Sequence, residues 1–203
     1  RRPCTDFARI EAPNPDISHV RGTDRIVLLP RMGPTVPIAA AGLRGEGLKV
    51  ECLPEATREV LRVGRRYTSG KECIPAVATL AGVLHRIEHG DPSERYAFFM
   101  PAAAGPCRQG VYNIFDKIVF EKLNLGDRLT IVTQPEHDFF KGLGKGPALR
   151  IWAAIVAADF LREMLHDVQP VEKIAGATRA IHDEYFARIE AQLESSPGPS
   201  LWG

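Results

Sequence analysis

Short apolar runs alternate along the chain with longer stretches in which apolar and polar residues recur at helical spacing. Four runs have the length and apolar content of buried parallel strands, at residues 24–29, 48–53, 95–100 and 128–133. The remaining pattern predicts helices at residues 35–46, 55–63, 76–89, 109–123, 148–168 and 173–193. We therefore predict an α/β fold: an open parallel four-stranded sheet, flavodoxin-like or Rossmann-like, with helices on both faces and two extra C-terminal helices.

The stretches without periodicity mark the expected domain boundaries. Residues 1–23 are rich in Pro, Asp and Arg, and we expect an extended arm or linker there, with a disordered leader as the alternative. Residues 24–168 form the expected α/β domain, residues 169–194 a C-terminal helix, and the Pro/Gly/Ser-rich residues 195–203 a flexible tail. The chain begins with Arg1 and not with Met, so we expect a domain fragment whose activity depends on other parts.

Composition and charge narrow the classes of function. The 203 residues carry a net charge of +1, so bulk electrostatics favours neither nucleic acid nor an anionic membrane as a partner. No apolar run is long enough to span a bilayer, and no signal peptide opens the chain. The four cysteines are therefore expected to be reduced thiols of a cytoplasmic protein, and they include no CxxC pair of the kind that structural zinc sites use.

Two turns bounded by Gly and Pro each place a cysteine just before a predicted helix. They are Gly70–Pro75, with Cys73, and Gly105–Tyr112, with Cys107. A cysteine at a helix start lies near unpaired N–H groups and the positive end of the helix dipole, which favour the thiolate, the form that binds metal or acts as a nucleophile. Because ligands collect at the carboxyl ends of parallel strands, we expect the two turns to face each other there. The alternative is that both cysteines are small buried hydrophobes, the commonest fate of a free cysteine.

Lys71 and Arg108 flank the two cysteines and are the candidate cofactor-binding residues. They could stabilise a reduced iron–sulfur cluster or hold phosphates, or they could be ordinary surface charges. Two thiolates complete a [4Fe–4S] cluster only with help from a twofold dimer, from a second domain, or from Cys4 if the arm folds back. Cys52 lies within a predicted strand, where core packing is expected.

Other local patterns are weaker indications of a functional site. Residues 142–146 are glycine-rich and contain a lysine, but they lack the spacing of a phosphate-binding P-loop. His85 and His89 are four residues apart on a predicted helix, without the glutamate of a zinc-protease motif, and solvated or capping roles are expected for them. His137, in the loop after the fourth strand, is the histidine that we keep as a functional candidate. No catalytic residue is assigned.

The two cysteine motifs resemble those of a known family. Gly70–Pro75, Phe98–Pro101 and Gly105–Asn113 are similar to a segment of the large CoA-substrate-specific enzyme activases, which are related to the activator of 2-hydroxyglutaryl-CoA dehydratase. The segment itself is similar to the 2-hydroxyacyl-CoA dehydratase subunits. The similarity runs from about Ile26 to Leu165 and is most specific at the two cysteine turns.

The resemblance also implies a cofactor and a reaction, which the spacing of the cysteines alone does not. Dehydratase subunits of this family have flavodoxin-like α/β domains and hold a [4Fe–4S] cluster through cysteines, and the cluster passes one electron to a 2-hydroxyacyl-CoA to enable the loss of water. The related activator is an ATPase whose own cluster bridges a homodimer. By resemblance, Cys73 and Cys107 are the expected cluster ligands in the intact protein. Dehydratase subunits supply three cysteines and two match here, so the third ligand is non-cysteine, or it is Cys4, or the cluster is shared or lost.

The leading hypothesis is a dehydratase-like iron–sulfur domain of an activase-related protein, which relays electrons or docks a partner and is not active alone. Its expected partners are other domains of the same polypeptide or a dehydratase or activator subunit, with acyl-CoA as a candidate ligand and a homodimer as a candidate assembly. No nucleotide motif is present, so no ATPase activity is assigned to this chain. The rivals are a metal-free scaffold or partner-binding domain with structural cysteines, and a free-standing CoA-ester lyase.

Overall fold

The computed structural model describes residues 13–134, 138 and 141–195. Contacts divide the chain into two compact units. The first comprises the described residues up to Met32 and those from Lys49 to Leu143, and the second comprises Gly33 to Leu48 and the described residues from Gly144 onward. Each unit has its own apolar core.

A parallel sheet forms the centre of the first unit. Its strands are β1 (Ile26–Leu29), β2 (Val50–Cys52), β3 (Tyr96–Phe99) and β4 (Leu129–Val132). All neighbours pair in parallel, in the order β2-β1-β3-β4. The predicted α/β class with a four-stranded parallel sheet is thus confirmed, and the order is that of a flavodoxin-like sheet. Its direction of winding reverses between β1 and β3, which is where such sheets collect ligands at their carboxyl ends.

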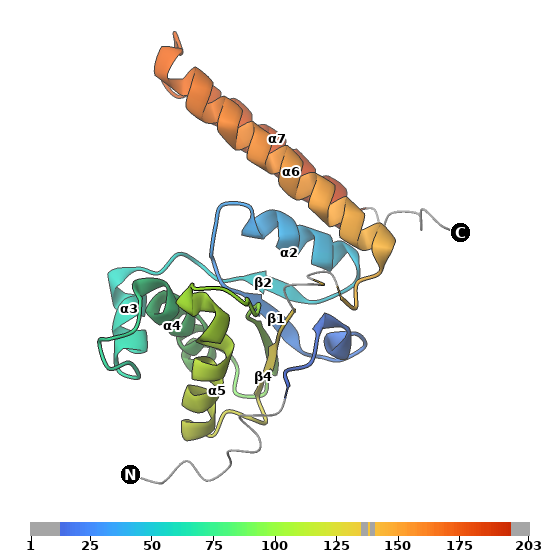
Figure 1. The fold of residues 1–203 in the computed structure, drawn as a ribbon. Helices are drawn as coiled ribbons and strands as arrows, with labels where there is room; N and C mark the ends of the chain where they lie inside the picture. The colour runs from blue at the N-terminus through green and yellow to red at the C-terminus, as the bar shows by residue number, and fades with distance from the viewer. Residues whose placement is uncertain (1–12, 135–137, 139–140, 196–203) are drawn as a thin grey trace. The chain divides into compact units, whose positions relative to one another are not determined.

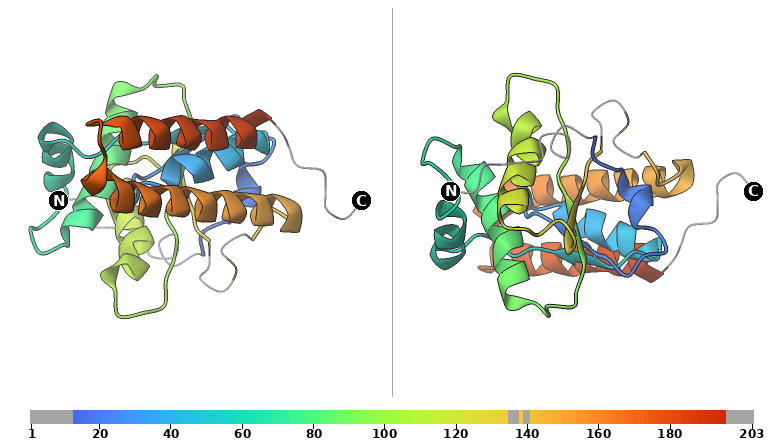
Figure 2. Two further views of the ribbon diagram at one scale, coloured as in Figure 1. Left: turned by 90° about the horizontal axis from the view of Figure 1, so that it is seen from above. Right: turned by 90° about the horizontal axis from the view of Figure 1, so that it is seen from below.

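Helices α4 (Ile74–His89) and α5 (Tyr112–Lys122) pack against one face of this sheet (Figure 1 and Figure 2). Successive strand residues point to opposite faces, so every second residue can meet these helices. The shared core takes alternate residues from the strands and the apolar side of each helix: Leu28, Tyr96, Phe98, Leu129 and Ile131 from the sheet, and Leu80, Val83, Leu84, Ile87, Val119 and Phe120 from the helices. The short helix α3 (Arg58–Arg65) packs on α4.

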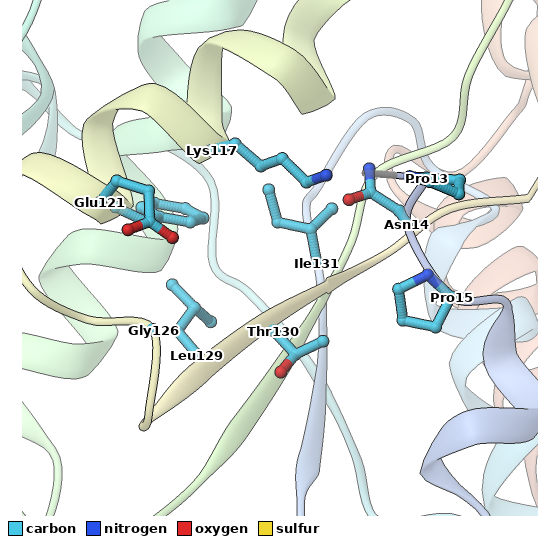
Figure 3. Close-up of a pocket in the computed structure, with 10 residues that line it drawn as sticks. Pro13, Asn14, Pro15, Lys117, Glu121, Gly126, Leu129, Thr130 and Ile131 are labelled. Carbon is cyan, nitrogen blue, oxygen red and sulfur yellow. The ribbon is translucent and has the colours of Figure 1, made fainter. Parts of the chain in front are cut away.

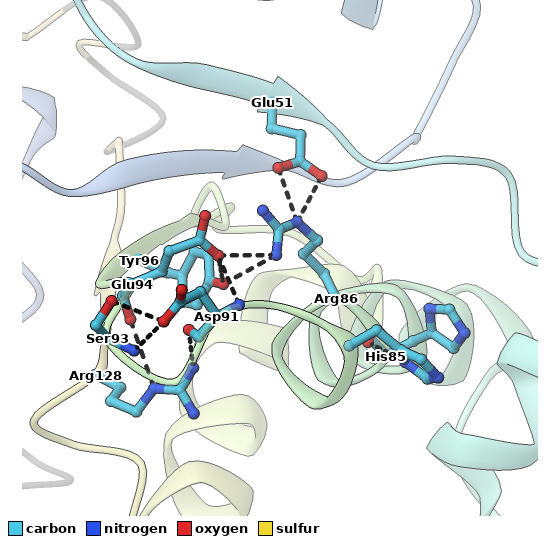
Figure 4. A network of polar contacts seen from close by, with 9 residues as sticks. Glu51, His85, Arg86, Asp91, Ser93, Glu94, Tyr96 and Arg128 are labelled. Carbon is cyan, nitrogen blue, oxygen red and sulfur yellow. Dashed lines mark hydrogen bonds and ion pairs between the residues drawn. The ribbon is translucent and has the colours of Figure 1, made fainter.

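A polar network ties α4 to two strands at the amino end of β3 (Figure 4). The Nε of Arg86 on α4 donates to Glu51 on β2 at 2.8 Å, and its Nη1 donates to Glu94 at 3.1 Å and to the hydroxyl of Tyr96 at 2.9 Å. The hydroxyl of the fully buried Tyr96 in turn donates to Glu94. These hydrogen bonds, first that from Tyr96 and then that from Arg86, hold the pKa of Glu94 below its ordinary value. The network therefore anchors the end of the sheet that lies away from the cysteine turns.

The described part of the expected arm, from Pro13, includes the 3-10 helix η1 (Ile17–Val20). The carboxylate of Asp16 caps this helix by accepting the N–H of Ser18 at 3.0 Å. The N–H of Thr133, just after β4, donates to the carbonyl of Pro15 at 2.9 Å. Because η1 buries its two apolar residues, this stretch is a folded part of the first unit. The pattern missed it because four residues are too few to show a period.

The second unit is built from α2 (Val36–Gly45), α6 (Lys145–Val168) and α7 (Ala177–Ser195), with the 3-10 helix η4 (Gln169–Val171) between the last two. Its core is Ile38, Ala41, Ala158 and Leu193, with Ala154, Ile155, Phe186 and Ile189 packed against them. An ion pair of 2.7 Å joins Arg150 on α6 to Glu46 at the end of α2. The contacts thus group α2 with the C-terminal helices, whereas the pattern assigned residues 35–46 and 148–168 to one α/β domain. Among the described residues, none of the helices combines the length and the apolar content that a membrane span requires.

Candidate functional site

The first cysteine turn is organised by a carboxylate. Gly70 has a φ of 87°, which glycine adopts without strain. The carboxylate of Glu72 accepts hydrogen bonds of 2.9 to 3.1 Å from the N–H groups of Ser69, Gly70 and Lys71. These bonds, with that from Ser69 the strongest, hold the pKa of Glu72 below its ordinary value. The turn thereby places Cys73 at the N-cap of α4, with an extended backbone.

The second cysteine turn begins a helix in two steps. Cys107 is the N-cap of the 3-10 helix η2 (Arg108–Val111), and α5 follows directly at Tyr112. The predicted helix from residue 109 therefore starts as a 3-10 turn. A Cβ atom at Gly110 would lie 2.2 Å from the carbonyl oxygen of Ala103, closer than any real contact. Glycine at this position lets the loop after β3 lie directly against η2.

Two hydrogen bonds join the two turns. The Nη1 of Arg108 donates to the carbonyl of Lys71 at 3.2 Å, and the hydroxyl of Tyr112 lies 2.6 Å from the Sγ of Cys73. α5 follows the carboxyl end of β3, and α4 runs back toward the amino end of the same strand, so both helices begin near the carboxyl edge of the sheet. The turns thus contact each other in the first unit, near the edge where the pattern expects a ligand.

The residues of both turns enclose a hollow of about 210 Å³. Its lining includes Lys71, Cys73 and Arg108, three of the predicted site residues, together with Tyr112 and the apolar side chain of Phe115. Cys107, the fourth, is exposed and is not one of the lining residues, although its neighbour Arg108 is. The structure therefore brings Cys73, Lys71 and Arg108 together and leaves Cys107 next to them on the surface.

The electrostatics of the hollow favour a thiolate at Cys73. The hydrogen bond with Tyr112 lowers the pKa of the Cys73 thiol, the charge of Arg108 adds to this effect, and partial burial opposes it. Burial, together with the contact to Cys73, raises the pKa of the Tyr112 hydroxyl. The Tyr112 hydroxyl therefore stays protonated, and it can donate the hydrogen bond when Cys73 is a thiolate. Such a thiolate can ligate a metal or act as a nucleophile.

Replacing Tyr112 by phenylalanine should raise the pKa of Cys73, because the variant loses the hydrogen-bond donor and keeps the ring. The pH at which iodoacetamide begins to alkylate Cys73, followed by mass spectrometry of its peptide, should shift upward, and alkylation at pH 7 should slow several-fold. Tyr185→Phe, at an exposed tyrosine of the second unit, is the matched control and should leave the profile unchanged. Equal profiles for wild type and Tyr112→Phe would show that the hydroxyl does not stabilise the thiolate.

Within the described residues, the predicted ligands fall short of a complete metal site. Cys73 and Cys107 are two thiols, whereas a [4Fe–4S] cluster takes four ligands. Within residues 13–134, 138 and 141–195, no group of three or more His, Cys, Asp and Glu is placed to hold a metal ion. The candidates Cys4 and His137 lie outside the described residues. The two predicted ligands are therefore half of the number that such a cluster takes.

Cys52 and the paired histidines are not among the residues that line the hollow. Cys52 ends β2, is partly buried, and has its Sγ 3.8 Å from the carbonyl of Leu53. His85 and His89 stack on α4 with ring centroids 4.1 Å apart, and Nδ1 of His89 lies 2.8 Å from the carbonyl of His85. This local contact on the helix surface agrees with the expected solvated or capping role.

A second hollow lies between the segment before η1, helix α5 and strand β4 (Figure 3). It encloses about 190 Å³, and Lys117 and Asn14 point toward each other across it. Its lining residues are Pro13, Asn14, Pro15, Lys117, Phe120, Glu121, Gly126, Leu129, Thr130 and Ile131. These include no cysteine or histidine, so the chemistry that the pattern singled out lies in the hollow around Cys73.

Sequence reasoning missed the role of Tyr112. It is part of the second motif, but its contact is with Cys73, 39 positions earlier in the chain. No local spacing connects the two residues, so only the folded sheet, which brings the starts of α4 and α5 together, reveals the pair.

Comparison with known proteins yields no relative: no family model, no curated protein and no solved structure matches this chain.

Proposed function

We propose that this chain is the dehydratase-like iron–sulfur domain of a protein related to the CoA-substrate-specific enzyme activases, and that it relays electrons or docks a partner in 2-hydroxyacyl-CoA dehydration. The resemblance of the two cysteine motifs suggests the family. The observation that carries the proposal is the contact between the two cysteine turns, where the hydroxyl of Tyr112 lies 2.6 Å from the Sγ of Cys73 and Arg108 donates to the carbonyl of Lys71.

Each side chain around the hollow would have a separate role in such a site. Cys73 and Cys107 would be the thiolate ligands, and Lys71 and Arg108 would offset their negative charge. Tyr112 would donate a hydrogen bond to the Cys73 sulfur, and hydrogen bonds to ligating sulfurs tune the reduction potential of a cluster. A [4Fe–4S] cluster bound there would supply one-electron transfer. The remaining ligands would come from another domain of the same polypeptide, from a dehydratase or activator subunit, or from a second copy.

The size of the hollow favours a relay or docking role over an independent enzyme. Pockets that bury drug-sized ligands are typically about 300–1,000 Å³. The hollow around Cys73 has about 210 Å³, too little for a whole acyl-CoA. We therefore infer that an acyl-CoA, if it reaches this site, is held mainly by a partner. Because the ligands have to stay reduced thiolates, we also infer a cytoplasmic location.

Anaerobic reconstitution with ferrous iron and sulfide tests the proposal. The wild-type chain should take up iron and acid-labile sulfide and develop a broad visible absorption band. Cys73→Ser and Cys107→Ser should each lose the iron and the band, because each removes one thiolate ligand.

Cys52→Ser is the matched control, since Cys52 lies at the end of β2 apart from the hollow, and it should retain the iron. Cys4→Ser tests whether the first cysteine is a third ligand. A wild-type chain that binds no iron under these conditions would overturn the proposal in favour of a metal-free scaffold with structural cysteines. Retention of iron by both Cys73→Ser and Cys107→Ser would overturn the assignment of the ligands.

A further inference from the structure

Helix α6 carries a row of large apolar side chains on its outer side. The exposed fractions of these side chains run from 38% for Val156 to 62% for Phe160. The row consists of Leu149, Trp152, Val156, Phe160 and Met164. Their spacing of three and four residues places them along one side of the helix, over about 22 Å at 1.5 Å per residue. The opposite side holds the buried residues of the helix: Ile151, Ala158 and Leu165. A helix that is apolar on both sides is normally covered on both.

Charged residues extend this row at both ends. Lys145 lies at the first residue of α6, and Glu163 and Asp167 lie in its last two turns, all three exposed and on the same side as the row. A cation at the start of a helix and anions at its end are unfavourable for the dipole of that helix. The arrangement becomes favourable if a second helix runs antiparallel along the row and presents its own acidic end to Lys145.

We propose that a second copy of this chain docks antiparallel on α6, with the twofold axis at Val156. Trp152 and Phe160 are each four positions from Val156, and Lys145 and Asp167 are each eleven positions from it. A twofold axis there places Trp152 against Phe160 of the second copy and Lys145 against Asp167 of the second copy, and symmetry repeats each contact. Leu149 then faces the methylene groups of Glu163 of the second copy.

The charges favour this occupant over other arrangements. A parallel pair of α6 helices would set Lys145 against Lys145 and Asp167 against Asp167, which repel each other. The antiparallel pair replaces both repulsions by attractions and offsets the unfavourable dipole interactions at both helix ends. Its centre is apolar and aromatic, which is typical of the side chains that dominate binding energy at protein interfaces.

Charge reversal tests the pairing directly. Light scattering after size-exclusion chromatography, over a range of concentrations, should give a dimer for the wild-type chain. Lys145→Asp should weaken the dimer by about tenfold, because two acidic side chains then face each other at both symmetric contacts. Asp167→Lys should weaken it similarly, because two lysines then face each other. The double variant Lys145→Asp/Asp167→Lys should recover the wild-type affinity, and Phe160→Glu should give a monomer. Circular dichroism checks that each variant is folded.

A cross-link tests the position of the axis. Val156→Cys should form a disulfide-linked dimer under mild oxidation, because the two copies of residue 156 meet on the axis. Ala187→Cys, an exposed position on α7, is the matched control and should stay at the background of the native cysteines.

Four results would overturn the proposal. A wild-type monomer at every concentration would mean that something other than a second copy covers the row. A dimer insensitive to the charge reversals would lie on another surface. Failure of the double reversal to restore the dimer, or no cross-link above the control at residue 156, would exclude the antiparallel arrangement.

Discussion

Replacing Asp116 by asparagine should raise the free energy of unfolding by more than about 1 kcal/mol at pH 7. Asp116 lies on α5, is 1% exposed, and neither of its carboxylate oxygens has a hydrogen-bond partner among the described residues. Burial raises the pKa of this carboxyl well above its ordinary value. Each unit of such a shift corresponds to about 1.4 kcal/mol between the protonation states. The asparagine has nearly the same shape and does not titrate, so the folded variant does not have to retain a proton.

The contribution of Asp116 to the free energy of unfolding should fall as the pH rises. A carboxyl whose pKa is raised in the folded state contributes stability that is fully present below its ordinary pKa of about 3.9 and is lost as pH rises through the raised value. Urea unfolding at pH 5 and pH 8 should therefore show a loss of stability with rising pH in the wild type that is smaller in Asp116→Asn. Asp127→Asn, at an exposed aspartate, is the control and should match the wild type. Parallel pH profiles for wild type and Asp116→Asn would contradict the prediction.

Gly110→Ala adds only one methyl group, but it is expected to disturb the candidate site strongly. The new Cβ would lie 2.2 Å from the carbonyl oxygen of Ala103, and because that oxygen belongs to the backbone, either the loop or η2 has to move. Overpacking of this kind costs roughly 1–3 kcal/mol. A shift of η2 would carry Arg108 away from Lys71, so the stabilisation of the Cys73 thiolate and the uptake of iron should both fall.

The neighbouring Gly105 is a matched control in the same loop. A Cβ there has no atom within 4 Å, so Gly105→Ala should leave stability, the alkylation profile of Cys73 and iron uptake close to wild type. Urea unfolding and the alkylation rate at pH 7 measure both variants. If Gly110→Ala were as stable and as reactive as Gly105→Ala, the close approach of the loop would not be what positions Arg108.

The fold class followed from short-range pattern because parallel strands buried on both faces have to be apolar runs. Residues 24–29, 48–53, 95–100 and 128–133 each contain an observed strand, with the ends shortened. The ends are less well predicted because edge residues such as Arg95 and Arg128 are placed by long-range contacts: Arg128 donates to the carbonyl of Asp91 at 3.0 Å. The hydrophobic pattern alone also did not show the division into two units. The unit to which α2 belongs depends on which helices its apolar side contacts.

The sequence predicted the two cysteine turns and that they face each other, but not the side-chain contacts between them. A cysteine before a helix and a basic residue beside it are local features, and both turns were found from them. The hydrogen bond between Tyr112 and Cys73, the burial of Asp116 and the close approach at Gly110 join residues far apart in the chain or depend on packing around them. None of these contacts produces a periodicity or a residue spacing in the sequence from which it could be predicted.

By itself, then, the sequence determined the alternation of strands and helices, the positions of the two cysteine turns and the apolar character of α6, since each depends on neighbours within a few residues. Only the tertiary structure decided that Cys73 meets Tyr112, that Arg108 reaches Lys71, and that large apolar side chains of α6 are exposed. The physical reason is the same in each case: burial and hydrogen bonding between distant segments depend on how the chain returns on itself, which local propensity does not encode.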